Sequence, residues 1–159
     1  MKPAGEFSLP NGNPVKILTC GEETLGQLTV IEYIDNTQGN PPPFTRHEFV
    51  EVFTVLSGTL AFQYDGKKAF TVSAGNAETV ASGRSHTFWN PEQTPLRILL
   101  ACTPAGLDSF FQDMHTEVCG MQDEERNESA LAERIALLRS KHGIEVTNPP
   151  PNIGDIEFS

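Results

Sequence analysis

Short β-prone segments separated by turn residues are the sequence feature that most constrains the fold. The clearest pair is TLAFQY at 59–64 and KKAFTV at 67–72, joined by Asp65-Gly66. Asp-Gly between two such runs is a strong hairpin signal, because both central residues of the turn need a positive φ. Similar runs predict further strands at 15–18, 28–34, 51–56, 78–80, 86–89 and 96–102. Many short strands with glycine and proline turns predict an all-β sandwich or barrel.

The C-terminal part has a different period. In DEERNESALAERIALLRSKH at 123–142, Leu131, Ile135 and Leu138 form one apolar stripe, which predicts an α-helix packed on the barrel. Asp123 is the predicted N-cap. The domain organisation we expect is an N-terminal extension at 1–14, a barrel core at 15–104, and a C-terminal part at 105–159. That last part would comprise a lid segment near the barrel mouth, the helix of about 123–142 and an extended tail.

Composition narrows the possible partners. The chain has 159 residues and a formal net charge of -10, which argues against nucleic acid and anionic membranes as partners. Cys20, Cys102 and Cys119 are odd in number and widely spaced, so neither a disulfide framework nor a zinc-thiolate site is expected. Without an apolar run long enough for a signal peptide or membrane helix, the prediction is a cytoplasmic protein that binds a small molecule.

Two motifs carry a resemblance to the cupin superfamily. The first runs from Gly39 through PPPFTRHEFVEVFTVLSG at 41–58, and the second spans 75–90. The matching residues are Gly39, Glu51 and Gly58 in the first motif, and Gly75, Gly83, His86 and Asn90 in the second, with Ala81 in place of a proline. The flanks GEETLGQLTVIEYI and TPAGLDSFF resemble small cupins similar to quercetin dioxygenases. The resemblance implies a double-stranded β-helix, or jelly-roll, barrel and a homodimer.

The resemblance also locates the metal site of the family. Its four ligand positions, two histidines, a glutamate and a third histidine, fall on Phe44, Arg46, Glu51 and His86 in this chain. A phenyl ring cannot coordinate a metal, and a guanidinium stays protonated and repels a divalent cation. The prediction is therefore a degenerate site without a metal cofactor.

The leading hypothesis is a metal-independent cupin enzyme acting on a small aromatic or polyketide-like metabolite. Glu51 and His86 would be the acid and base, and Arg46 would stabilise an anion. The reaction would be isomerisation, cyclisation, dehydration or ring opening. The predicted substrate-binding residues are Phe44, Phe53 and Phe88, which share the inward parity of their strands, and Asn90.

Two alternatives stay open. In the first, His47, Glu51 and His86 hold one divalent metal such as iron, nickel, manganese or zinc in a quercetinase-like dioxygenase. This requires His47 to point inward, whereas strand alternation points it outward if Arg46 faces the interior. A local bulge could reverse that facing. In the second, the chain is a non-catalytic small-molecule-binding cupin whose polar residues only satisfy one another.

Overall fold

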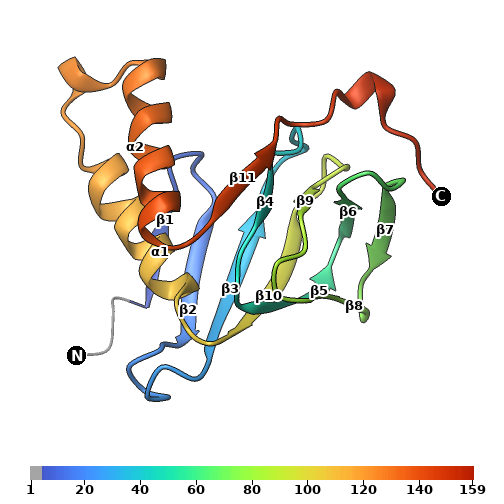
Figure 1. Ribbon diagram of the computed structural model, residues 1–159, viewed down its shortest axis with the longest axis horizontal. Helices are drawn as coiled ribbons and strands as arrows, with labels where there is room; N and C mark the ends of the chain where they lie inside the picture. The colour runs from blue at the N-terminus through green and yellow to red at the C-terminus, as the bar shows by residue number, and fades with distance from the viewer. Residues whose placement is uncertain (1–4) are drawn as a thin grey trace.

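A computed structural model describes residues 5–159, which form two antiparallel sheets packed face to face with helices at one side (Figure 1). The six-stranded sheet has the order β1 (Glu6–Ser8), β2 (Pro14–Thr19), β3 (Thr29–Asp35), β10 (Leu96–Thr103), β5 (Val50–Ser57), β8 (Ala77–Val80). The five-stranded sheet has the order β11 (Glu145–Asn148), β4 (Phe44–Arg46), β9 (His86–Trp89), β6 (Thr59–Tyr64), β7 (Phe70–Ser73). This arrangement confirms the predicted all-β jelly-roll barrel.

Each predicted strand is present, with ends shifted by up to three residues. At the predicted hairpin, Gly66 has a φ of 72° and the Lys67 amide donates a hydrogen bond to the Tyr64 carbonyl at 3.0 Å. Asp65 lacks the positive φ that the predicted turn type requires, since Leu25 is the one non-glycine residue with a positive φ among residues 5–159. The sequence did not predict β1, β4 or β11. The last two form one edge of the five-stranded sheet, where Arg46 pairs with Glu145 and Thr45 with Val146.

The main core lies between the sheets. Its largest fully buried side chains include Phe53, Phe62, Ile31, Leu60 and Leu96. Strand alternation explains which residues of β5 are buried, since Glu51, Phe53 and Val55 all face inward. A smaller cluster around Trp89 lies against the C-terminal tail.

The predicted C-terminal helix is shorter than expected at its start. Helix α2 spans Glu128–Lys141, and the Asn127 side chain caps it by accepting a hydrogen bond from the Ala130 amide at 2.9 Å. The predicted cap, Asp123, instead begins the separate 3₁₀ turn η2 (Asp123–Glu125). Asn127 is the better cap because its extended backbone aims the side-chain oxygen at the free amides of the first turn.

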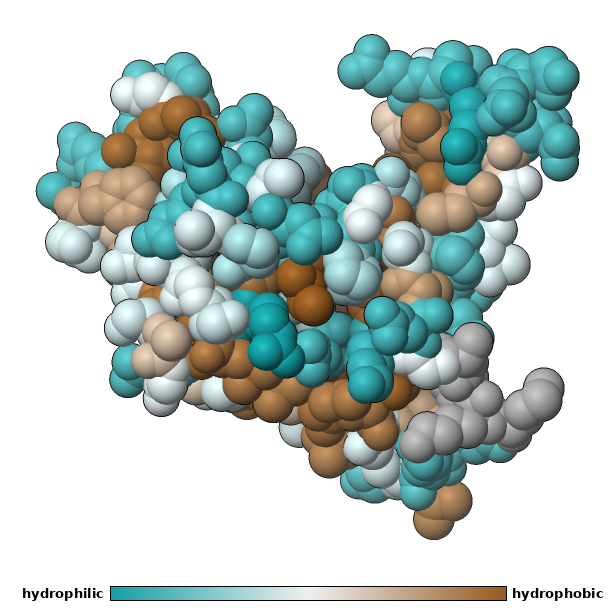
Figure 2. Space-filling view, turned by 180° about the vertical axis from the view of Figure 1, so that it is seen from behind, coloured by the Kyte–Doolittle hydropathy of each residue, from teal (hydrophilic) through white to brown (hydrophobic). Residues whose placement is uncertain are grey.

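The segment between barrel and α2 is also helical. It forms α1 (Leu107–Asp113) and the π-helical turn η1 (Met114–Val118), and a 3₁₀ turn η3 (Ile153–Asp155) lies in the tail. Leu107, Phe110, Met114 and Val118 are buried in the main core, so α1 and η1 are packed against the barrel. From behind, the helical part at upper right is covered mainly by hydrophilic side chains, and the outline is indented beside it (Figure 2).

None of the helices formed by residues 5–159 combines the length and apolar character that a membrane crossing requires. The three cysteines are free, with Cys20 and Cys102 buried, as the spacing predicted.

Candidate metal centre and ligand pocket

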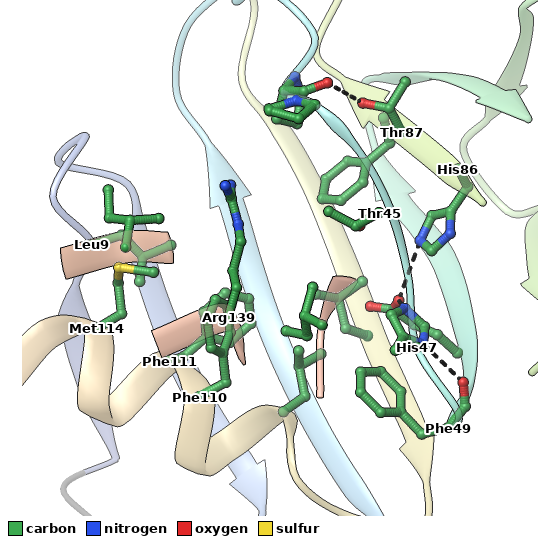
Figure 3. Close-up of a pocket in the computed structure, with 18 of the residues that line it drawn as sticks. Leu9, Thr45, His47, Phe49, His86, Thr87, Phe110, Phe111, Met114 and Arg139 are labelled. Atoms are coloured by element: carbon green, nitrogen blue, oxygen red, sulfur yellow. Dashed lines mark hydrogen bonds and ion pairs between the residues drawn. The ribbon is translucent and has the colours of Figure 1, made fainter. Parts of the chain in front are cut away.

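A pocket of about 330 Å³ lies between the barrel and the helices. This volume is within the range of pockets that hold small organic ligands. Its barrel side includes Thr45, His47, Glu51, His86, Phe88 and Leu100, and its helical side includes Phe110, Phe111, Met114, Ile135, Arg139 and Ile144. Figure 3 shows these two sides facing each other. Most of the lining is apolar, so the few polar groups decide what the pocket can do.

Glu51 and His86 meet at the barrel side from opposite sheets. Glu51 lies on β5 and His86 begins β9, and both side chains are almost completely buried. His86 Nε2 lies 3.7 Å from Glu51 Oε2. The sequence correctly placed both side chains inside the barrel, because each has the inward parity of its strand.

His47 joins them from the bend between β4 and β5. Its side chain is buried, and its Nε2 lies 3.0 Å from Glu51 Oε2. The ring of Phe49 stacks on the His47 ring at 3.7 Å between centroids. The His47 carbonyl accepts a hydrogen bond from the Gly83 amide at 2.8 Å. The predicted outward facing of His47 is therefore wrong.

Backbone carbonyls determine how the two histidines present their nitrogens. His47 Nδ1 lies 2.9 Å from the Phe49 carbonyl oxygen, and His86 Nδ1 lies 2.9 Å from that of Arg84. A carbonyl only accepts hydrogen bonds, so each Nδ1 carries a hydrogen and donates it. In the neutral ring, the lone pair is then on Nε2, which faces Glu51 in both cases.

The charge of Glu51 follows from the same contacts. Burial acts to raise the pKa of this carboxyl group, but the His47 and His86 rings, when their Nε2 atoms carry a proton, outweigh it and hold the pKa below its usual range. An ionised carboxylate and two nitrogen lone pairs then converge, with candidate ligand atoms all within 4.8 Å of one another. Such a group needs a positive charge between its members, either a proton or a metal ion.

These three residues fit a divalent metal. Two imidazole nitrogens and one carboxylate oxygen suit iron, zinc, nickel or manganese, and three protein ligands leave coordination positions open for a substrate or water. The backbone hydrogen bonds at both Nδ1 atoms are the kind that orient metal-binding histidines. The prediction of a degenerate metal site assumed that Arg46 and Phe44 occupy ligand positions. In the structure, neither residue belongs to the group of three candidate ligands.

Arg46 lies outside the barrel. About half of its side chain is exposed, and its Nε and one terminal nitrogen bind the two Glu145 carboxylate oxygens at 2.8 and 3.1 Å. The predicted inward facing of Arg46 is thus wrong, because its pairing with β11 places it on the outer surface. Phe44 is buried but does not line the pocket; Thr45, between them, does.

The other predicted binding residues differ in position. Phe88 lines the pocket, whereas Phe53 lies beneath it, with its ring centroid 4.9 Å from Phe88 and 6.0 Å from His86. Asn90 is fully buried outside the pocket. Its amide nitrogen donates to the carbonyls of Asp35 and Thr94 at 3.2 and 2.9 Å, so Asn90 holds loops together.

A spacing choice explains why the sequence analysis aligned Arg46, and not His47, with the second histidine of the family. The first cupin motif allows three or four residues between its second histidine and the glutamate. Four residues place that histidine position on Arg46, but three place it on His47 and the preceding one on Thr45. With a spacing of three residues, Thr45 replaces one ligand of the family's metal site, whereas a spacing of four replaces two. No comparable signal in the sequence pointed to Arg139, which reaches the pocket from α2.

Residues 33–102 match the family model described as a cupin domain. The two packed antiparallel sheets agree with that fold. No curated protein matches the sequence. The particular similarity to quercetin dioxygenases stays a prediction.

Solved structures agree on the fold. A RmlC-like cupin from Shewanella frigidimarina is 17% identical, with a TM-score of 0.56 over 68% of this chain and 90% of the other. KdgF from Halomonas sp. is 15% identical, with a TM-score of 0.56 over 67% and 93%. The polyketide cyclase RemF from Streptomyces resistomycificus is 18% identical, with a TM-score of 0.51 over 65% and 70%. At these identities the likeness concerns the fold alone.

Proposed function

We propose that this chain is a metal-dependent cupin enzyme that acts on a small, largely apolar molecule in the pocket. His47, Glu51 and His86 would hold one divalent ion. The observation that carries the proposal is the convergence of His47 Nε2 and His86 Nε2 on Glu51 at 3.0 and 3.7 Å. A bound metal would supply Lewis-acid chemistry to a substrate oxygen.

Side chains of the chain itself position the two histidines and exclude water from the pocket. Phe49 and the Phe49 carbonyl hold the His47 ring from its face and its edge. Phe62 stacks on the His86 ring with an interplanar angle of 2°. The apolar lining, including Phe88 and Leu100, would exclude water from a bound substrate and strengthen electrostatic interactions there.

Metal content tests this proposal. The protein should be purified without a metal-affinity tag and dialysed against iron, zinc, nickel or manganese. We expect about one ion per chain in the wild type, almost none in His47→Ala, and wild-type content in Arg46→Ala. The Arg46 control changes the neighbouring residue, whose side chain faces outward. A wild type without metal, or equal loading of all three proteins, would overturn the proposal.

A second candidate is metal-independent acid–base chemistry, with Glu51 and His86 as the acid and base. The 3.0 Å contact between His47 Nε2 and Glu51 favours it, because a proton can lie between these atoms. Isomerisation, cyclisation, dehydration and ring opening are reactions of this class. Turnover that survives chelation and is lost in Glu51→Gln would support it. Oxygen consumption with flavonol-like substrates would instead identify a dioxygenase.

If the chain is instead a non-catalytic binding module, it should bind ligand without turnover in any metal state.

The aromatic character of the ligand is part of our proposal and is supported by the aromatic lining of Phe49, Phe88, Phe110 and Phe111. The homodimer implied by the cupin resemblance and the cytoplasmic location stay predictions. Light scattering of the purified chain would test the first.

A further inference from the structure

Arg139 is a permanent positive charge in the lining of the pocket. It lies near the end of α2, with Ile135 and Ile144 also lining the pocket beside it. Figure 3 shows its side chain extended in the space between the helix that carries Phe110 and the barrel side that carries the two histidines. Among the described lining residues, no other lysine or arginine occurs.

The other basic residues near this helix have acidic partners. Arg134 pairs with Glu117 at 3.5 Å, and Lys141 pairs with Asp113 at 2.7 Å. The Arg139 guanidinium has no hydrogen-bond or ion-pair partner within residues 5–159. The neighbouring acids are already engaged.

Burial makes this unpaired cation costly. Arg139 is half-buried, and desolvation lowers the pKa of its guanidinium below the usual value. Arginine nonetheless stays charged at neutral pH. A partly desolvated charge without a partner is unfavourable, so an incoming anion would recover interaction energy at this point.

The pocket limits what that anion can be. One guanidinium in an otherwise apolar helical wall matches a single planar carboxylate, which it can bind through two parallel hydrogen bonds. Glu51, the one acidic residue that lines the pocket within the described chain, lies on the barrel side, where it would balance part of the charge of a metal ion. Arg139 has no anionic partner in residues 5–159, so the anionic end of a ligand is expected at α2.

We propose that Arg139 binds the carboxylate of the substrate, so that the substrate is a small carboxylic acid with an apolar body. The apolar body would fill the pocket toward His47, Glu51 and His86, where the reacting group would lie. This inference rests on the proposed function, because it names the substrate class for the same pocket.

Paired ligands test the proposal in chelator-treated protein, where a probe carboxylate cannot bind a metal. The probes are trans-cinnamate and its uncharged isostere trans-cinnamamide, measured by titration calorimetry. We expect the wild type to bind cinnamate about 10- to 100-fold more tightly than cinnamamide, as for a charge-assisted hydrogen-bonded pair. Arg139→Gln should remove this preference and leave cinnamamide affinity unchanged. Arg139→Lys, which keeps the charge, should retain part of it.

Arg134→Gln is the matched control, since Arg134 lies on the same helix and pairs with Glu117 at the surface. It should keep the wild-type preference. Equal affinity for the two probes in the wild type, failure to bind cinnamate, or a preference that survives in Arg139→Gln would overturn the role of Arg139. Metal content distinguishes the two proposals. Normal metal loading without a carboxylate preference overturns only this inference, and a carboxylate preference without metal loading overturns only the metal-dependent function.

Discussion

The ionisable groups on the barrel side and on the helical side of the pocket differ in their burial and in their partners. On the barrel side, His47, Glu51 and His86 are buried and hold one another, with each Nδ1 bound to a backbone carbonyl. On the helical side, Arg139 is half-buried and has no partner in the described chain. The first arrangement holds its groups in place by contacts with one another and with the backbone, and the second leaves a charge available for a ligand.

This difference follows from the elements that carry each side. Glu51 and His86 belong to strands whose ladders connect them to the rest of the barrel. Arg139 belongs to a helix whose buried residue is Leu138, and whose other apolar residues pack only partly against the core. A group on a sheet is positioned by many neighbours, whereas a group on a surface helix depends on a few.

Core truncation should give the largest effect and the clearest contrast. Phe53→Ala removes a fully buried ring beneath the barrel side and should lower the free energy of unfolding by about 3–5 kcal/mol. Phe111→Ala, on the partly buried helical side, should cost about 1 kcal/mol. Urea unfolding of both variants measures the difference. Equal losses would mean that the helical side is as tightly packed as the barrel.

Removing the aromatic ring that supports His47 should have a smaller effect, which is on metal affinity. Phe49→Leu removes the ring stacked on His47 and should weaken zinc binding about 2- to 10-fold, in keeping with the energy of an aromatic pair. Phe111→Leu makes the same change on the helical side and should leave zinc affinity unchanged. Competition with a chromogenic chelator gives both affinities. If both substitutions weakened zinc binding equally, the stack would have no special role.

Removing a contact that attaches α2 to α1 should have the smallest effect, which is on stability. The hydrogen bond from Lys141, together with that from His142, holds the pKa of Asp113 below its usual value against a smaller opposing effect of burial. A lowered folded-state pKa stabilises the protein above the unfolded value of about 3.9, and this stabilisation is lost as the pH falls through the folded pKa.

Asp113→Asn should therefore be less stable than the wild type near pH 7, by no more than about 1 kcal/mol because the ion pair is largely exposed. The gap should close as the pH falls below about 4. Thermal unfolding from pH 7 to pH 3 gives the comparison, and a gap independent of pH would exclude the ion pair as its cause.

Local patterns were sufficient for much of the fold and for two of the three residues of the candidate metal centre. Alternation in EVFTVL placed Glu51 and Phe53 on the inner face, and the second motif placed His86 and Phe88 on β9. The same reasoning failed at β4, a strand of three residues followed at once by a bend. Parity holds only while a strand continues, so it could not place His47.

By itself, the sequence determined most of the strands, the position of the Asp65-Gly66 turn, the C-terminal helix and the burial of Glu51, because each depends on residues close together in the chain. Only the tertiary structure decided between Arg46 and His47. Glu145, which is 99 residues away, pairs with Arg46 across β4 and β11 and holds it outside. It also decided that α2 brings Arg139 to the pocket. Both outcomes depend on contacts between distant segments, which no local periodicity encodes.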